Sequence, residues 1–378
     1  MAKNHMKRIA AALLVMMFAA TAIFIIPVGD DSSAAGKITV KDGRGNEVEF
    51  DDVANHVVTS GVGTSATVVQ IGQLEKIVVC DSYSNSSTEE VLKDLKARVS
   101  EGKIKANGNV YSSGLGAFKT DVVDAADTEK GGQFDKEKDV IILTASKATN
   151  DTLKTYFEGL GFKKILLWDS ITEYSQIIDF AKAVSLVLTG KTCNEVKSME
   201  LVQSTIKDRL ASEKITEDKE TKALYVRLSS GNYTIGNTGS LAISMMEAAG
   251  AKNIGYDSSK SGTTYGVEAS AFTKFREDNG TDRIVVFLDS NVTEAKASEI
   301  KTLMGDNTTL VQLKSLWNNY SIDSKDGVWT MGCALYPDYF EGDVPEVKEN
   351  DNTTLYIAIG GAAVVVVIIL AFFMLKRH

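Results

Sequence analysis

Residues 171–188 read ITEYSQIIDFAKAVSLVL, and this stretch at the centre of the 378-residue chain decides the fold. Drawn as a helix, it carries apolar side chains such as Ile177 and Phe180 over much of its surface. A helix that is apolar on more than one side is typical of one packed between two masses. Helical patterning continues as far as Ser212, with one predicted break at Gly190-Lys191. We therefore expect a long central helix with a folded lobe on either side.

Upstream of this helix, apolar runs of strand length alternate with helical patterns. A predicted hairpin, 38–40 with 48–50, opens the series around the turn residues 42–46. The predicted strands are 56–60, 76–81, 139–144 and 164–169, and the predicted helices are 64–71, 88–99, 121–126 and 151–160. Continuous β-branched strands that alternate with helices predict a parallel sheet buried on both faces.

Downstream of the central helix, the same alternation returns. The predicted strands are 222–229, 283–289 and 309–313, and the predicted helices are 241–249, 268–276 and 292–304. The predicted fold class is therefore α/β, with two Rossmann-like lobes joined by one long helix. The predicted divisions are an N-terminal α/β lobe over 36–170, an interlobe helix over 171–190 and a C-terminal α/β lobe over 191–340.

The two ends of the chain predict export and anchoring. Residues 1–35 have a cationic start and an apolar run, which favours a signal peptide, with an uncleaved N-terminal anchor as the alternative. The uncharged run 354–375 is long enough for a transmembrane helix. The basic tail 376–378 is then cytoplasmic by the positive-inside rule, and the residues 341–353 form an acidic stalk outside. We therefore predict a single-pass protein of the cell membrane whose soluble body is extracellular.

The surface chemistry of the body agrees with an outward-facing protein. No Cys follows the first apolar run, so a lipoprotein anchor is excluded. Eight Asn-x-Ser/Thr triplets are candidate glycosylation sites: Asn85, Asn150, Asn232, Asn279, Asn291, Asn307, Asn319 and Asn352. Together with the C-terminal anchor, these features favour a glycoprotein of an archaeal or Gram-positive cell surface, with the archaeal one preferred.

Composition excludes several classes of function. The net charge is −9, without a Lys/Arg-rich stripe, which argues against nucleic acid as a partner. The three cysteines, Cys80, Cys193 and Cys333, are far apart and indicate neither a disulfide framework nor a metal site. Of the three histidines, His56 alone lies in the body. We predict no enzyme activity, no cofactor and no protein-bound metal ion.

A ligand is expected beyond the carboxyl ends of the strands, where two lobes would face each other. The segments there are rich in hydroxyls, amides and aromatic rings, which suit a sizeable polar ligand. Backbone N–H groups of residues 60–65, at the start of a helix, also suit an anionic group. The predicted ligand-binding residues are Ser60, Thr64, Asp81, Tyr83, Ser113, Gly114, Ser146, Arg227, Asn232, Tyr233, Tyr265, Asp289, Trp317 and Trp329. Arg227 suits a carboxylate or catecholate of the ligand, or else a surface ion pair.

The order of these parts resembles the helix-linked substrate-binding proteins of ABC importers, which handle iron–siderophore complexes, haem and cobalamin. The resemblance covers roughly residues 37–341. The sharpest match is 233–254, YTIGNTGSLAISMMEAAGAKNI, which is similar to the family's Gly-rich entry, helix and Ala-Gly-x-x-Asn. Further matches are the opening hairpin 38–50, the strand–helix–strand 56–78 and the closing segments 317–322 and 334–340.

The resemblance implies a monomer that captures a metal chelate between its lobes and delivers it to a permease with its ATPase. Iron–siderophore comes first, haem or corrinoid next, and an oxyanion remains open. It also implies acidic docking residues for the permease, at positions matched by Asp121 and Glu268, although both are also ordinary helix-start acids. The alternative is a surface sensor or adhesion module with the same bilobed fold and no transport role.

Overall fold

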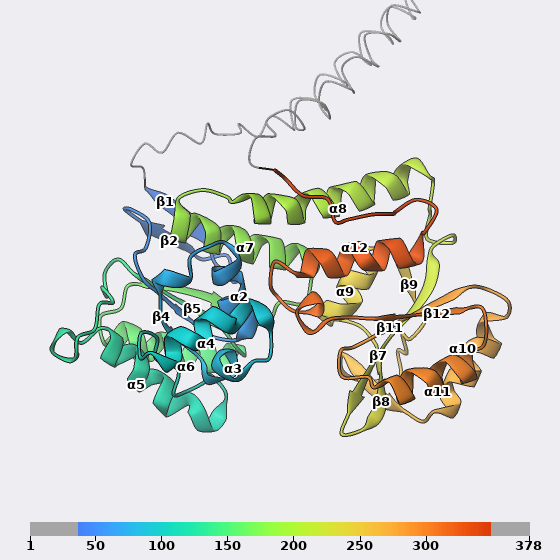
Figure 1. The fold of residues 1–378 in the computed structure, drawn as a ribbon, viewed down its shortest axis with the longest axis horizontal. Coiled ribbons are helices and arrows are strands. Elements are labelled where there is room, and N and C mark those ends of the chain that lie inside the picture. The colour runs from blue at the N-terminus through green and yellow to red at the C-terminus, as the bar shows by residue number, and fades with distance from the viewer. Residues whose placement is uncertain (1–36, 349–378) are drawn as a thin grey trace, which may run out of the picture. The chain divides into compact units, whose positions relative to one another are not determined.

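The computed structural model describes residues 37–348 (Figure 1). The predicted signal peptide, the transmembrane helix 354–375, the basic tail and the end of the stalk lie outside the described residues. Within residues 37–348, no helix combines the length and the apolar content that a membrane crossing requires.

The first lobe is built on a four-stranded parallel sheet in the order β4-β3-β5-β6. Its strands are β3 (Val57–Thr59), β4 (Ile77–Cys80), β5 (Val140–Thr144) and β6 (Lys164–Trp168). Its helices are α2 (Val62–Gln70), α3 (Ser82–Ser86), α4 (Lys93–Ser100), α5 (Leu115–Ala125) and α6 (Lys147–Gly159), with short 3-10 turns at Leu74–Lys76, Glu90–Leu92, Ser112–Gly114 and Thr128–Lys130. All five residues of β5 are buried, as expected for a strand covered by helices on both faces.

The second lobe is built on a six-stranded mixed sheet in the order β10-β8-β7-β11-β12, in which β9 also pairs with β7. Its strands are β7 (Thr221–Ser229), β8 (Asn232–Gly236), β9 (Ala251–Asn253), β10 (Thr264–Val267), β11 (Ile284–Leu288) and β12 (Thr308–Gln312). Its helices are α9 (Leu241–Ala248), α10 (Ser270–Asn279), α11 (Glu294–Met304) and α12 (Ser324–Leu335), with a 3-10 turn at Ser315–Asn318. The α/β composition and the two-lobed arrangement predicted from the sequence are confirmed.

Two strands of the second sheet, β8 and β10, were not predicted, and they contain the predicted ligand-binding residues Asn232, Tyr233 and Tyr265. β8 pairs antiparallel with β7 across a two-residue turn, because Ser229 lies opposite Asn232. Both turn residues, Ser230 and Gly231, have positive φ, which is the conformation that tight hairpins require. β10 then pairs with β8 and extends the sheet. The Ser-Gly pair was the sequence signal for this hairpin.

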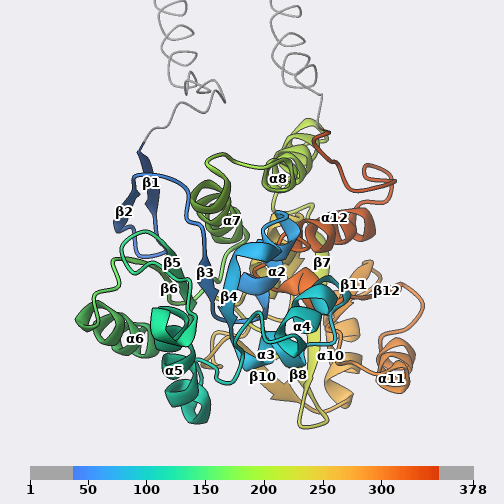
Figure 2. The same cartoon turned by 60° about the vertical axis from the view of Figure 1, so that its left-hand side comes forward.

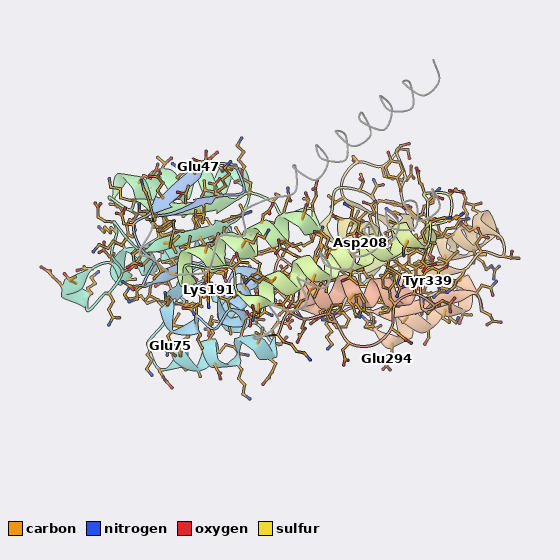
Figure 3. All side chains as sticks on the ribbon, turned by 90° about the horizontal axis from the view of Figure 1, so that it is seen from above. Glu47, Glu75, Lys191, Asp208, Glu294 and Tyr339 are labelled. Carbon is orange, nitrogen blue, oxygen red and sulfur yellow. The ribbon has the colours of Figure 1, made fainter. Side chains whose placement is uncertain are left out.

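The connection between the lobes is a pair of helices rather than the single long helix predicted. α7 (Tyr174–Thr189) starts at the second lobe, where the backbone N–H of Tyr174 donates to Ser244 Oγ of α9 over 3.1 Å. It ends in the first lobe, where the Leu188 carbonyl accepts from Lys76 Nζ over 2.6 Å. α8 (Asn194–Ser212) lies beside it and contacts α12 in the second lobe (Figure 3, with Lys191 at the turn).

The reversal between α7 and α8 has a local cause. Gly190 ends α7 in the left-handed conformation, with φ of 77°. The hydroxyl of Ser185 then donates to the Lys191 carbonyl over 2.7 Å and accepts from the Cys193 N–H over 3.0 Å. These bonds reverse the direction of the chain, so α8 runs back alongside α7 after the predicted break at Gly190-Lys191.

The largest core cluster is continuous across the two lobes. It contains Val57 and Ile142 of the first sheet, Phe180 of α7, and Tyr225 and Phe287 of the second sheet. Two smaller clusters cover the outer face of each sheet. Each large apolar side chain buried in this way contributes about 1.5–3 kcal/mol. The shared core therefore holds the two lobes to a common set of helices.

The N-terminal hairpin is fixed to the first lobe by one arginine. β1 (Ile38–Lys41) pairs antiparallel with β2 (Glu47–Phe50), as predicted. From the turn, Arg44 donates from Nε and Nη2 to the two oxygens of Asp169, over 2.8 and 2.7 Å. It also donates to Asp151 over 2.6 Å. Burial alone would raise the pKa of Asp169, but the bonds from Arg44 and Asn150 hold it below its ordinary value of 3.8.

We expect Arg44→Met to lower the free energy of unfolding by about 2 kcal/mol at neutral pH, because it breaks charge-assisted hydrogen bonds. Since the pKa of Asp169 is lower in the folded chain, its pairing stabilises the fold above pH 3.8 and is lost as the pH falls further. Urea unfolding of both proteins at several pH values measures this. The difference between them should shrink below pH 3.8; a constant difference would assign the effect to packing alone.

The described part of the predicted acidic stalk is packed on the body. Lys325 of α12, which is almost fully buried, donates to Glu346 over 3.3 Å. The Val347 N–H donates to Ser198 Oγ of α8 over 2.9 Å, and Trp329 Nε1 donates to the Gly342 carbonyl over 3.2 Å. We call residues 342–347 the C-terminal strap. The part of the predicted stalk that the structure describes is therefore fixed to α8 and α12.

One predicted glycosylation site is buried. Asn150 is fully buried in α6, and its amide nitrogen donates to the Trp168 carbonyl over 3.1 Å and to Asp169 over 3.0 Å. A sugar on this nitrogen is incompatible with the folded chain. Asn232, Asn291 and Asn307 are exposed, so glycosylation there stays a prediction.

Candidate ligand-binding site

Polar residues meet at the carboxyl edge of the first sheet, as the parallel strands predicted. Ser60 follows β3, Asp81 follows β4 and Thr144 ends β5. The Thr144 N–H donates to Ser60 Oγ over 2.7 Å, and Thr144 Oγ1 lies 3.0 Å from Thr64 Oγ1. All four side chains are buried. We call Ser60, Thr64, Asp81 and Thr144 the strand-end cluster.

The predicted anion site at residues 60–65 is occupied by the protein's own carboxylate. The Gly61 N–H, at the start of α2, donates to Asp81 Oδ2 over 2.5 Å. The other oxygen, Oδ1, accepts from the N–H and the hydroxyl of Ser84, over 2.9 and 3.0 Å. Asp81 is fully buried, and this burial raises its pKa despite the hydrogen bonds. Asp81 therefore positions the loop, and its complete burial keeps it from an external ligand.

Two exposed tyrosines lie next to this cluster. Tyr83 and Tyr111 are 50% and 47% exposed, and their rings meet edge to face with centroids 5.6 Å apart. The pKa of Tyr111 is raised, mainly because its hydroxyl is partly buried and to a smaller extent by the charges of Asp81 and Tyr83. Exposed aromatic rings are uncommon in residues 37–348, where five large apolar side chains are exposed in all. We call Tyr83 and Tyr111 the tyrosine pair; it offers ring faces on which a ligand can stack.

The loop that carries Tyr111 is held by tight backbone contacts. The Ser82 N–H donates to the Gly108 carbonyl over 2.7 Å, and the Tyr111 N–H donates to Asn109 Oδ1 over 2.9 Å. Ser113 and Gly114, which were predicted as ligand-binding residues, follow in the same loop. Gly114 backs onto the side chain of Asn109, while Ser113 is exposed. The tyrosine pair therefore stands on a rigid support.

Tyr320 of the second lobe reaches this edge and was missed by the sequence interpretation. Its ring meets Phe180 of α7 edge to face with centroids 6.1 Å apart. Its hydroxyl lies 3.3 Å from Thr144 Oγ1. α2 faces the second lobe at this point (Figure 2). No local sequence pattern marks Tyr320, because the contact joins residues 176 positions apart.

A second group of predicted residues lies at the carboxyl edge of the second sheet. Arg227, near the end of β7, is exposed and lies on the same side of the strand as Tyr225. Asp289 follows β11 and accepts a hydrogen bond from the Tyr225 hydroxyl. Trp317 is partly buried, and Lys314 Nζ lies 4.9 Å from its ring centroid.

Several predicted residues do not join either group. Tyr233 is 3% exposed, packs on Phe272 and donates to Glu299 over 2.7 Å, so it belongs to the outer core of the second lobe. Trp329 is buried between α12 and the C-terminal strap. Both are strand or helix residues that face a core, which their aromatic character alone did not reveal. Three further predicted residues also lie outside both groups. Asn232 is at the exposed start of β8, and Ser146 is the exposed N-cap of α6. Tyr265 lies on β10, where its hydroxyl donates to the Gly255 carbonyl.

The two predicted docking acids differ in exposure. Asp121 is 4% exposed, and its carboxylate accepts from the N–H and the side-chain amide of Asn107, over 2.7 and 2.8 Å. It is therefore a structural residue and not a surface acid. Glu268 is exposed and precedes α10, so its role in docking stays a prediction.

This architecture, with two α/β lobes joined by helices, is the fold of helix-linked substrate-binding proteins. Similar solved structures include Helicobacter pylori CeuE with Ni(II) bound, at 14% identity and a TM-score of 0.55, over 85% of this chain and 94% of that one. The TroA-like periplasmic binding protein FepB from Veillonella parvula matches at 12% identity and 0.59, over 80% and 91%. The periplasmic catecholate-siderophore binding protein VctP from Vibrio cholerae matches at 16% and 0.53, over 80% and 99%.

These likenesses confirm the predicted resemblance at the level of the fold. A comparison with protein-family models gave no match, and neither did a comparison with curated proteins.

Proposed function

We propose that this chain is the substrate-binding component of an ABC importer, which binds a metal chelate between its lobes and delivers it to a membrane permease. Iron–siderophore complexes are the leading class, with haem and corrinoids next. The observation that carries the proposal is the exposed tyrosine pair beside the buried strand-end cluster, at the edge of a parallel sheet where ligands bind. The fold shared with VctP, a periplasmic catecholate-siderophore binding protein, supports it.

The chemistry of the two edges suits a large chelate. The tyrosine pair supplies ring faces to planar or aromatic ligand groups. Arg227 and Lys314 supply positive charge from the second lobe, where a catecholate or carboxylate of the chelate would pair with them. Neither role needs a bond to be made or broken in the ligand. The chain therefore binds and orients its cargo.

The proposal includes a position at the outer surface of the cell membrane. Residues 354–375 would hold the body near its permease, and Glu268 would dock one lobe onto it. The exposed sequons Asn232, Asn291 and Asn307 suit an extracellular surface. The body would act as a monomer.

Thermal-shift measurements on the full-length chain test the proposal. The probes are a ferric triscatecholate, a ferric hydroxamate, haemin and cobalamin, each with its metal-free form as the control. We expect at least one chelate to raise the unfolding temperature in a concentration-dependent way, because a ligand that binds the folded state stabilises it. No stabilisation by any of the four would reject the proposal. Binding without association to any permease would favour the sensor alternative.

A further inference from the structure

Tyr320 makes a group of contacts in which a residue of the second lobe enters the first. It follows β12 and the 3-10 turn Ser315–Asn318. Its carbonyl accepts from Thr67 Oγ1 over 3.5 Å, and its ring and hydroxyl reach Phe180 and Thr144. Two residues on, the Ile322 N–H donates to Gln70 Oε1 of α2 over 3.1 Å. One short segment thus forms a series of contacts between the lobes.

Two glycines of the first lobe make room for this ring. A Cβ on Gly63 would lie 2.7 and 2.8 Å from two ring carbons of Tyr320, and 2.9 Å from its carbonyl oxygen. A Cβ on Gly61 would overlap the Tyr320 hydroxyl. These distances are shorter than packed carbon atoms allow. The Gly61-x-Gly63 pattern, which fits no nucleotide-binding fingerprint, therefore has a steric purpose here.

The same ring lies behind the proposed binding surface. Burial, and then the charge of Tyr111, raises the pKa of Tyr320, and the charge of Asp81 adds to this effect. Tyr111 is half of the exposed tyrosine pair, and Thr144 belongs to the strand-end cluster. A ligand stacked on Tyr111 would therefore lie next to the residue that holds the second lobe in place.

We propose that Tyr320 is a positioning residue for ligand binding. It locks the second lobe in register with the strand-end cluster, so that groups from both lobes close on the same ligand. The locking of the lobes follows from the contacts alone. The effect on the ligand rests on the proposed function.

A double-mutant cycle tests the lock. We expect Gly63→Ala to lower the urea midpoint of the wild-type protein, because the new methyl group meets the Tyr320 ring. In a Tyr320→Ala background the same change should cost clearly less, because the ring is gone and only the backbone carbonyl of residue 320 remains close to the new methyl group. Tyr320→Phe keeps the ring and should retain the full penalty. An equal effect of Gly63→Ala in both backgrounds would overturn the lock.

Hydrogen exchange of the segment 318–323 gives a readout that a loss of global stability does not mimic. Tyr320→Ala should speed exchange of the Ile322 amide about 10-fold or more under native conditions. The matched control is Tyr336→Phe, which removes a buried hydroxyl bond to the Gly250 carbonyl within the second lobe. It should leave the segment unchanged. Protection of Ile322 that survives Tyr320→Ala would contradict the proposal.

Chelate binding separates the positioning role from the proposed function. With a chelate that stabilises the wild type, Tyr320→Ala should weaken binding about 10-fold or more, while Tyr336→Phe should not. Equal affinity in wild type and Tyr320→Ala would remove the positioning role and leave the proposed function intact. If the wild type binds no chelate, the proposed function fails, and the cycle and exchange data still decide the lock.

Discussion

Replacing Tyr83 and Tyr111 together by alanine is expected to weaken chelate binding about 100-fold. Tyrosines at the centre of binding sites contribute about 2 kcal/mol or more each, although two contacting rings do not add fully. Both side chains are about half exposed, so their removal should change the unfolding temperature little. Titration of the chelate followed by tyrosine and tryptophan fluorescence measures the affinity.

The matched control is Tyr156→Ala. Tyr156 is a similarly exposed tyrosine on α6, where Lys119 covers its ring. The Tyr156→Ala variant should bind the chelate with the same affinity as the wild type. The double Phe variant separates stacking from hydrogen bonding, because it keeps both rings and removes both hydroxyls. If the double Ala variant binds as tightly as wild type, the tyrosine pair is not the binding surface.

Replacing Gly108 by alanine is expected to destabilise the first lobe by about 3 kcal/mol, at the upper end for overpacking. A Cβ there would lie 2.6 Å from the carbonyl carbon of Ala117 and the carbonyl oxygen of Gly114, and closer still to the Phe118 nitrogen. These are backbone atoms, so no side chain can rotate away. The same strain would move the loop that carries Tyr111 and should lower chelate affinity as well.

Gly116→Ala, in the adjacent helix α5, is the control for Gly108→Ala. A Cβ on Gly116 meets no atom within 4 Å, so alanine should be neutral or stabilise by about 0.5–1 kcal/mol. Urea unfolding of the two variants measures the contrast. Equal stability of both would mean that the backbone near Gly108 relaxes freely, and that the tyrosine pair lacks the rigid support assigned to it.

The sequence predicted the parallel parts of the fold well, since buried strands such as β5 and β11 are runs dominated by β-branched residues and without charge. It failed where polar residues form strands. β8 and β10 are rich in Thr, Gly and Tyr, and they exist because β7 offers them a pairing edge. The sequence located the break between α7 and α8. It did not show that the chain reverses there, because the reversal depends on the bond from the Ser185 hydroxyl to the Lys191 carbonyl.

The candidate site was predicted from the positions of the strand ends, and the prediction missed what depends on tertiary contacts. The ends of β3, β4 and β5 meet because parallel strands share an edge, so Ser60, Thr64 and Asp81 came together as expected. Asp81 accepts two local hydrogen bonds from Ser84 as the N-cap of α3, but the bond from the Gly61 N–H, which fixes its second oxygen, is tertiary. Tyr233 was misplaced because its face of the sheet is fixed by the register of β8 with β7. Tyr320 could not be found from the sequence, because its contacts with Gly61 and Gly63 join distant parts of the chain and leave no local pattern.

The C-terminal strap has a mechanical consequence. Tension applied at Lys348 would enter the body through the bond of Val347 to Ser198 on α8 and the ion pair of Glu346 with Lys325 on α12. Both helices pack on the core that the lobes share, so the force would reach this core through helices before it reaches the strands of either sheet. A body pulled from this end would therefore be held first through α8 and α12, and not through the loops that carry the tyrosine pair.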